Sequence, residues 1–185
     1  LADRKALGDR HEVEYNLDLI RALGLPVSVP EWHFPPLLPE QREVLHLLEE
    51  KGIRTSAPFI AVHPWTSHPS KQWPIERFQQ LIEQLAARPD AQIVIVGGPE
   101  ERIRAAELTW SDRSVANLVG RLTLRQLAAL FQRAQLVVSN DSGPVHLAAA
   151  VKTKTVVLFG TSNPATGPRR WGPWGEGHVV IWKGA

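Results

Sequence analysis

The chain of 185 residues carries a formal net charge of +2, with 43% hydrophobic and 22% charged residues, the composition of one globular domain or of a domain with an extension. Its basic residues are scattered, which argues against a nucleic-acid partner, and no apolar run is long enough for a transmembrane segment. The absence of cysteine excludes disulfide bonds and thiolate metal sites.

Both ends of the sequence predict a piece of a longer protein. The chain begins at Leu1 and contains no methionine, although an open reading frame begins with one. Residues 179–182 form an apolar run typical of a strand, and the sequence stops shortly after it, so we also expect a C-terminus that is cut. No secretory signal pattern opens the sequence.

Residues 1–55 predict two helices joined by a linker. Val13, Leu17 and Ile20 recur at helical spacing and predict a helix over residues 10–23, ended by Gly24 and Pro26. Five prolines between residues 25 and 39 predict an extended linker. Apolar residues at positions 44, 47 and 48 predict a second helix that stops near residues 51–52. We expect this part to be an N-terminal helical extension with a proline-rich linker.

From residue 56 onward, short apolar runs alternate with helical patterns. Buried strands are predicted at residues 59–62, 93–96, 136–138 and 155–159, with a weaker strand at 117–119. Helices are predicted after Trp73-Pro74, over residues 100–108, and behind a capping box formed by Thr123 and Gln126. This alternation predicts an α/β fold, a Rossmann-like three-layer parallel sheet over residues 56–185. Such sheets bind ligands at the carboxyl ends of their strands.

The most informative segment is the polar turn between the strand at 136–138 and a short helix. It contains Asp141, Ser142, Gly143 and Pro144, and His146 follows within the first turn of the helix. A helix start exposes unpaired N–H groups and the positive end of the helix dipole, and glycine lets a ligand approach closely. The turn therefore predicts an anion site. The alternative is an ordinary helix cap with a buried histidine.

Two further loops follow strands. Thr66, Ser67 and Lys71 come after the first strand and offer hydroxyls and a flexible cation, which suit a phosphate. The glycine spacing of a Walker loop is absent, and the alternative is a solvated loop anchored by Trp73.

Glu100 or Glu101, after Gly97-Gly98-Pro99, is placed to accept hydrogen bonds from a ribose, although acids are also common in a first helical turn. The three loops together predict a nucleoside diphosphate site.

The remaining histidines carry less functional weight. His11, His33 and His46 are expected at the surface, and His63 is expected to be structural because it ends a strand. His68 has no partners at metal-ligand spacing, so no metal site is predicted.

The chain resembles glycosyltransferase family 9, the bacterial lipopolysaccharide heptosyltransferases. The resemblance is carried by residues 71–74 (KQWP), 97–100 (GGPE), 118–120 (LVG) and 140–148 (NDSGPVHLA), followed by Phe159-Gly160-Thr161. It runs from about residue 10 to the end. It implies a GT-B type enzyme with two Rossmann-like halves, of which residues 56–185 would be the C-terminal, nucleotide-sugar donor-binding half and residues 1–55 the end of the acceptor half.

The resemblance also implies roles for particular residues. The donor, ADP-heptose, would be held through its diphosphate by Thr66, Ser67, Lys71, Asp141, Ser142, Gly143 and His146. Its ribose would be held by Glu100. The catalytic base would be an aspartate of the missing N-terminal half, so no catalytic residue is expected in this fragment.

The implied reaction is inverting, metal-independent heptose transfer to the inner core of lipopolysaccharide, with no cofactor besides the ADP-sugar donor substrate. The lipopolysaccharide core acceptor would bind through the missing half. We expect a cytoplasmic location, with any peripheral attachment to the inner membrane made by that half or by a partner.

Two other classes of function remain open in the sequence. One is another nucleotide-sugar enzyme such as an epimerase, and the other is a non-catalytic nucleotide-binding module. No Gly-x-Gly-x-x-Gly turn supports a dinucleotide enzyme. A nucleophilic role for Ser142 is disfavoured because Asn140 stands where a nucleophile elbow has its first glycine.

Overall fold

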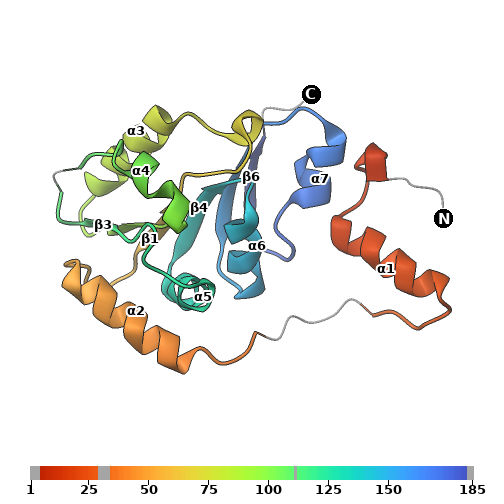
Figure 1. Ribbon diagram of the computed structural model, residues 1–185, viewed down its shortest axis with the longest axis horizontal. Helices are drawn as coiled ribbons and strands as arrows, with labels where there is room; N and C mark the ends of the chain where they lie inside the picture. Colours follow the sequence, from red (N-terminus) through yellow and green to blue (C-terminus); the bar gives the residue numbers. More distant parts are fainter. Residues whose placement is uncertain (1–4, 29–33, 111, 183–185) are drawn as a thin grey trace.

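The computed structural model describes residues 5–28, 34–110 and 112–182, and within them six parallel strands form one sheet in the order β3-β2-β1-β4-β5-β6 (Figure 1). The strands are β1 (Ile60–His63), β2 (Ile93–Ile95), β3 (Val115–Asn117), β4 (Leu136–Asn140), β5 (Thr155–Phe159) and β6 (Val179–Trp182). The expected Rossmann-like α/β fold is confirmed. β1 and β4 are neighbours, and the direction in which strands are added reverses between them, which makes this the topological switch point of the sheet.

Helices cover both faces of the sheet. The α-helices are α1 (Glu12–Ala22), α2 (Leu38–Glu50), α3 (Ile75–Ala86), α4 (Arg102–Ala105), α5 (Leu124–Arg133), α6 (Gly143–Ala150) and α7 (Pro168–Trp171). Short 3-10 turns are η1 (Lys5–Leu7), η2 (Pro69–Lys71), η3 (Pro99–Glu101) and η4 (Pro164–Thr166). One buried cluster joins α2 and α5 to the sheet, and a second joins α3 and α4 to its other face. The result is the expected three-layer arrangement.

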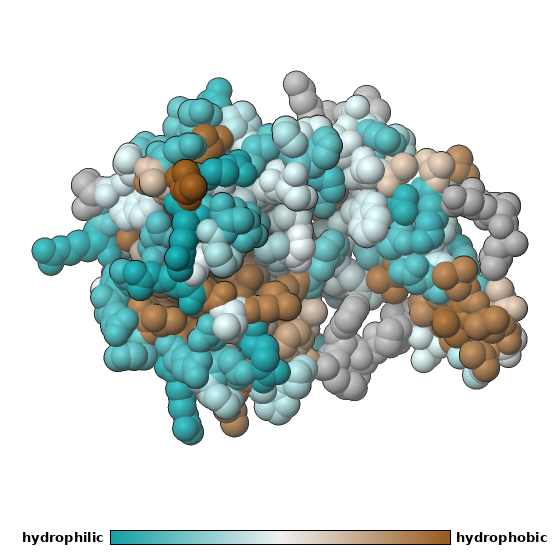
Figure 2. Space-filling view, in the orientation of Figure 1, coloured by the Kyte–Doolittle hydropathy of each residue, from teal (hydrophilic) through white to brown (hydrophobic). Residues whose placement is uncertain are grey.

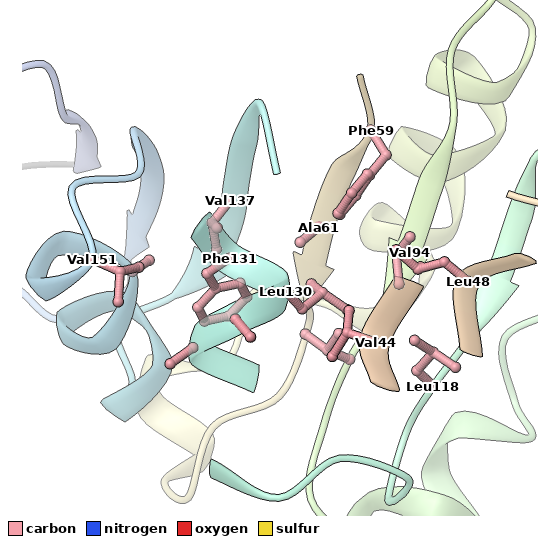
Figure 3. Close-up of a cluster of buried hydrophobic side chains, with 14 of the residues drawn as sticks. Val44, Leu48, Phe59, Ala61, Val94, Leu118, Leu130, Phe131, Val137 and Val151 are labelled. Atoms are coloured by element: carbon pink, nitrogen blue, oxygen red, sulfur yellow. The ribbon is translucent and has the colours of Figure 1, made fainter. Parts of the chain in front are cut away.

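The first of these clusters extends across the predicted boundary between residues 55 and 56. Val44 and Leu48 of α2 are fully buried and belong to the same cluster as Leu130 and Phe131 of α5 and Val94 of β2 (Figure 3). Their apolar surface is removed from water together, which ties α2 to the sheet. The second helix is therefore part of the packed core.

Local sequence signals explain most element boundaries. The predicted capping box is confirmed, because the Thr123 hydroxyl accepts a hydrogen bond from the Gln126 N–H at 3.2 Å and the Gln126 side chain accepts one from the Thr123 N–H at 2.8 Å.

The strand expected at 117–119 lies instead at Val115–Asn117. The Asn117 side chain accepts a hydrogen bond from the Val119 N–H at 2.9 Å and so turns the chain out of the sheet.

The helix expected over residues 100–108 is also shorter than predicted. It consists of η3 and α4, and the last turn tightens through hydrogen bonds from Ala106 N–H to Ile103 O and from Glu107 N–H to Arg104 O. The chain then leaves the helix, and Leu108 is buried in the cluster with α3. Burial of this leucine fits the early end of the helix.

The N-terminal segment lies at one end of the molecule and contacts the region around α7 (Figure 1). Arg170 of α7 pairs with Glu12 at 2.7 Å and donates to the Lys5 carbonyl at 3.0 Å. The rest of α1 is more open: Figure 2 shows apolar side chains gathered there, and Leu19, Ile20 and Leu23 are all exposed. Within the described ranges, no helix has the length and apolar character needed to cross a membrane.

The histidine expectations have mixed outcomes. His46 is exposed, as expected. His11 is not a free surface residue, because its ring lies 4.6 Å from that of Trp174 and its Nε2 atom is 2.9 Å from the Gly172 carbonyl. It also caps α1, which the sequence pattern did not indicate. His33 falls outside the described residues.

We predict that Leu48→Ala lowers the free energy of unfolding by about 2–5 kcal/mol, because it opens a cavity in a core shared by α2 and the sheet. His46→Ala on the exposed face of the same helix serves as the control and should change stability by less than about 0.5 kcal/mol. Urea unfolding of both variants measures the effect. A small loss for Leu48→Ala would show that α2 does not fold with the sheet.

Candidate functional site

A pocket of about 340 Å³ opens at the carboxyl ends of the strands, next to the switch point. Loops that follow β1, β2, β3 and β4 all contribute to it, so residues far apart in sequence meet there. Its lining includes six residues that the sequence predicted, counting both of the alternative acids: Thr66, Ser67, Glu100, Glu101, Ser142 and Gly143. The three predicted loops therefore share one pocket.

The N-terminus of α6 opens into this pocket. Ser142 occupies the N-cap position in the extended conformation typical of caps, yet its hydroxyl makes no capping hydrogen bond among the described residues. A Cβ atom built on Gly143 would meet none of the described atoms within 4 Å, so the approach to the helix end is open. The start of the first turn at Gly143 and the positive end of the dipole therefore face space that an anion can enter.

Lys71 and Asp141 lie beside the pocket, outside the set of described residues that line it. The Lys71 ammonium is 2.7 Å from the Asp141 carboxylate. Asp141 is 5% exposed, whereas the side chain of Lys71 is partly exposed. Thr66 donates a hydrogen bond to the Asp141 carbonyl at 3.4 Å and so connects this pair to the pocket wall. The ammonium has three donor hydrogens, and the ion pair leaves some of them for a ligand.

His146 lies on α6 near this ion pair, and its ring is partly buried. Burial is the main cause that lowers its pKa, and the charge of Lys71 acts in the same direction while that of Asp141 opposes it. A neutral imidazole brings a hydrogen bond rather than a charge. The structure thus places His146 beside Lys71 and Asp141, with no place among the described residues of the pocket wall.

His63 forms part of the pocket floor, although the sequence pattern marked it only as structural. It is 5% exposed, and burial lowers its pKa to about 4, so the ring is neutral at physiological pH. Its Nδ1 atom lies 3.2 Å from the Ser139 hydroxyl and 3.3 Å from the Ser142 hydroxyl. It is both a buried structural histidine and a neighbour of the α6 N-cap.

Asn140 fixes the loop after β1 to the end of β4. Its Oδ1 atom accepts a hydrogen bond from the Trp73 N–H at 2.9 Å, and its Nδ2 group donates to the Pro64 carbonyl at 2.8 Å. The ring of Trp73 packs edge-on against that of Phe78, with 4.8 Å between the ring centroids, so Trp73 also anchors the loop. The anchored ends hold Thr66 and Ser67 at the pocket.

The two glutamates after β2 differ in environment. The Glu101 side chain is 16% exposed, accepts a hydrogen bond from the Gly98 N–H at 2.5 Å, and lies 4.0 Å from His63 Nε2. Burial raises its pKa. Glu100 is exposed at the rim of the pocket. A Cβ atom on Gly97 would come within 2.6 Å of the Trp65 indole nitrogen, so this turn requires a small residue.

Sequence reasoning missed an apolar part of the pocket lining. Leu122, Leu124 and Leu127 line it together with Thr123, the N-cap of α5. The signal was present in the capping box directly after the third strand, but leucines of an amphipathic helix do not by themselves indicate a ligand. Within the described ranges, no group of acidic or histidine side chains could hold a metal ion.

Comparisons with known proteins agree with this geometry. The model of glycosyltransferase family 9 (heptosyltransferase) matches residues 2–185. Lipopolysaccharide heptosyltransferase 3 of Escherichia coli is 30% identical over 178 residues, which cover 93% of this chain and 50% of that protein. The chain thus spans about half the length of the curated relatives it matches.

Solved structures show the same fold. A family 9 glycosyltransferase from Veillonella parvula superposes with a TM-score of 0.82 at 23% identity, covering 94% of this chain and 49% of that chain. Escherichia coli heptosyltransferase WaaC with ADP superposes with a TM-score of 0.68 at 26% identity, covering 94% and 51%. The match of the family model over nearly the whole sequence decides the assignment: this chain belongs to glycosyltransferase family 9, the heptosyltransferase family.

Proposed function

We propose that this chain is the donor-binding half of an inverting glycosyltransferase that transfers heptose from ADP-heptose to the inner core of lipopolysaccharide. The observation that carries the proposal is the uncapped N-terminus of α6, which opens into a pocket at the switch point of the sheet. Further support comes from a relative of the same fold, Escherichia coli WaaC, whose structure holds ADP. Residues 56–185 would form this half, and residues 1–55 would lead in from the acceptor half.

The diphosphate is bound at the end of α6. Gly143 supplies backbone N–H donors, Thr66 and Ser67 supply hydroxyls, and the ammonium of Lys71 supplies positive charge. Asp141 holds this ammonium in place, and neutral His146 adds a hydrogen-bond donor beside it. The site binds the diphosphate through these groups without a metal ion.

The nucleoside lies across the rest of the pocket. Its ribose is held between two carboxylates: Glu101 is a fixed acceptor because the Gly98 N–H orients it, and Glu100 reaches the same edge from the rim. The base packs on the wall formed by Leu122, Leu124 and Leu127. An apolar wall provides area for the base but little discrimination, so specificity for adenine depends on backbone groups.

The transfer step follows from this placement. A hydroxyl of the acceptor attacks the anomeric carbon of the heptose, the bond from that carbon to the diphosphate oxygen breaks, and ADP leaves. Negative charge grows on the diphosphate as the bond breaks, where the α6 dipole and Lys71 stabilise it. The base that removes the proton of the acceptor hydroxyl belongs to the preceding half. We place the enzyme in the cytoplasm, with any peripheral attachment to the inner membrane made by that half or by a partner.

Titration calorimetry in EDTA tests the site. We expect the chain to bind ADP more tightly than UDP or GDP, and Lys71→Ala to weaken ADP binding by about 10–100-fold, as for the loss of a charged hydrogen bond. Asp141→Asn is the matched control, because it keeps the Lys71 ammonium and leaves an amide oxygen of similar size that can still accept a hydrogen bond from it. This variant should lose less ADP affinity than Lys71→Ala. Unchanged affinity in Lys71→Ala would contradict the assignment.

Lys71→Ala also leaves the carboxylate of Asp141 buried without its cation, so its thermal unfolding has to be followed in parallel. The titration is run well below the unfolding temperature of the variant. Combining Lys71→Ala with Asp141→Asn restores the stability but not the ADP affinity. Recovery of affinity in the double variant would mean that Lys71 acts on the fold alone.

A second pair of variants separates the two carboxylates. Glu101→Gln should weaken ADP binding by about tenfold, because it removes the charge of the oriented acceptor, whereas Glu100→Gln should change it by no more than about threefold. Neither variant should affect binding of inorganic pyrophosphate, which lacks the ribose. Equal losses for ADP and pyrophosphate would place these side chains at the phosphates.

A further inference from the structure

Ser142 has the backbone of a helix cap but does not use its side chain as one. Its φ of −159° and ψ of 166° are extended, and Pro144 follows in the first turn, so a rotation of the side chain alone would bring its oxygen to the Val145 N–H. Instead the hydroxyl points back to the strand ends. It lies 3.3 Å from His63 Nδ1, 3.1 Å from the Ser139 hydroxyl and 3.2 Å from the Asn140 carbonyl.

Each hydroxyl of this cluster has more than one partner. The Asn140 carbonyl lies 2.8 Å from the Ser139 hydroxyl and 3.2 Å from the Ser142 hydroxyl, and its two lone pairs can accept both protons. His63 Nδ1 can therefore donate to a serine oxygen or accept from one, and in both cases the contact keeps the Ser142 side chain at the strand ends. The Nε2 atom of the neutral ring lies 4.0 Å from the Glu101 carboxylate.

We propose that His63 is a positioning residue whose Nδ1 atom holds the Ser142 hydroxyl away from the α6 N-terminus. The N–H groups of Gly143 and Val145 then have no side-chain partner among the described residues, and a diphosphate competes at Val145 only with a backbone bond of 3.1 Å to the Ser142 carbonyl. Pro144 has no N–H to offer. A Ser142 side chain that capped the helix would occupy the Val145 N–H and fill part of the anion site. The inference rests on the proposed function, since it assigns the histidine to the diphosphate end of that pocket.

The burial of His63 separates this role from that of a ligand contact. The residue is 5% exposed, and its two ring nitrogens face Ser139, Ser142 and Glu101. The contact with Ser142 joins two residues that are 79 positions apart in the sequence, one at the end of β1 and one in the turn after β4. His63 therefore acts on the ligand through the conformation of Ser142.

Four variants test the proposal. His63→Phe keeps a ring in the space but removes the nitrogen that contacts Ser142, so Ser142 turns to cap α6 and the dissociation constant for ADP rises about fivefold, the effect of one capping bond. His63→Asn retains a polar group near the position of Nδ1 and should bind ADP within about twofold of the wild type. In His63→Phe/Ser142→Ala no hydroxyl is left to cap the helix, so ADP affinity returns to that of Ser142→Ala alone.

Amide hydrogen exchange provides a readout that does not depend on ADP. In His63→Phe the Val145 amide should become more protected than in the wild type, and this extra protection should disappear in the double variant. A wild type that fails to bind ADP overturns the proposed function, while the exchange data still decide how Ser142 is held. The positioning role is overturned if His63→Phe and the double variant lose ADP affinity equally, or if Val145 protection does not change.

Discussion

The structure depends on one topological constraint, the parallel pairing of β1 with β4 at the centre of the sheet. Because the two strands run in the same direction, their carboxyl ends meet, and the loops after them face each other. His63 at the end of β1 therefore contacts Ser139 and Ser142, and Thr66 reaches the Asp141 carbonyl. Hydrogen bonds that join Asn140 to Pro64 and Trp73 fix the loop after β1 to the end of β4.

The polar groups around the pocket hold one another in place. Asp141 pairs with Lys71, the Gly98 N–H orients Glu101, and His63 Nδ1 contacts the Ser139 hydroxyl at the strand end. The end of α6 is the exception, because no side chain among the described residues caps its first turn. Dipoles that are already oriented need little reorganisation when a diphosphate binds or when negative charge grows on it during transfer.

Sequence reasoning succeeded where local patterns decide the outcome. The buried strands, the capping box at Thr123 and the polar turn at residues 141–143 are each set by neighbours in the chain. It did less well where distant residues decide. The His63–Ser142 contact and the Lys71–Asp141 ion pair join separate loops. Leu108, which was expected within a helix, is buried beyond the end of α4. No local pattern states which of the two adjacent acids, Glu100 or Glu101, accepts the hydrogen bond of the Gly98 N–H, so this orientation of Glu101 is evident only from the fold.

The central claim is that the end of α6 binds the diphosphate of the donor. The most direct measurement is a titration of the 15N-labelled chain with ADP in EDTA, followed by amide chemical shifts. The account predicts that the largest changes occur at Gly143, Val145 and His146, with further changes at Thr66 and Ser67, and that they saturate together. Saturable binding of ADP that leaves the amides of α6 unshifted would contradict it.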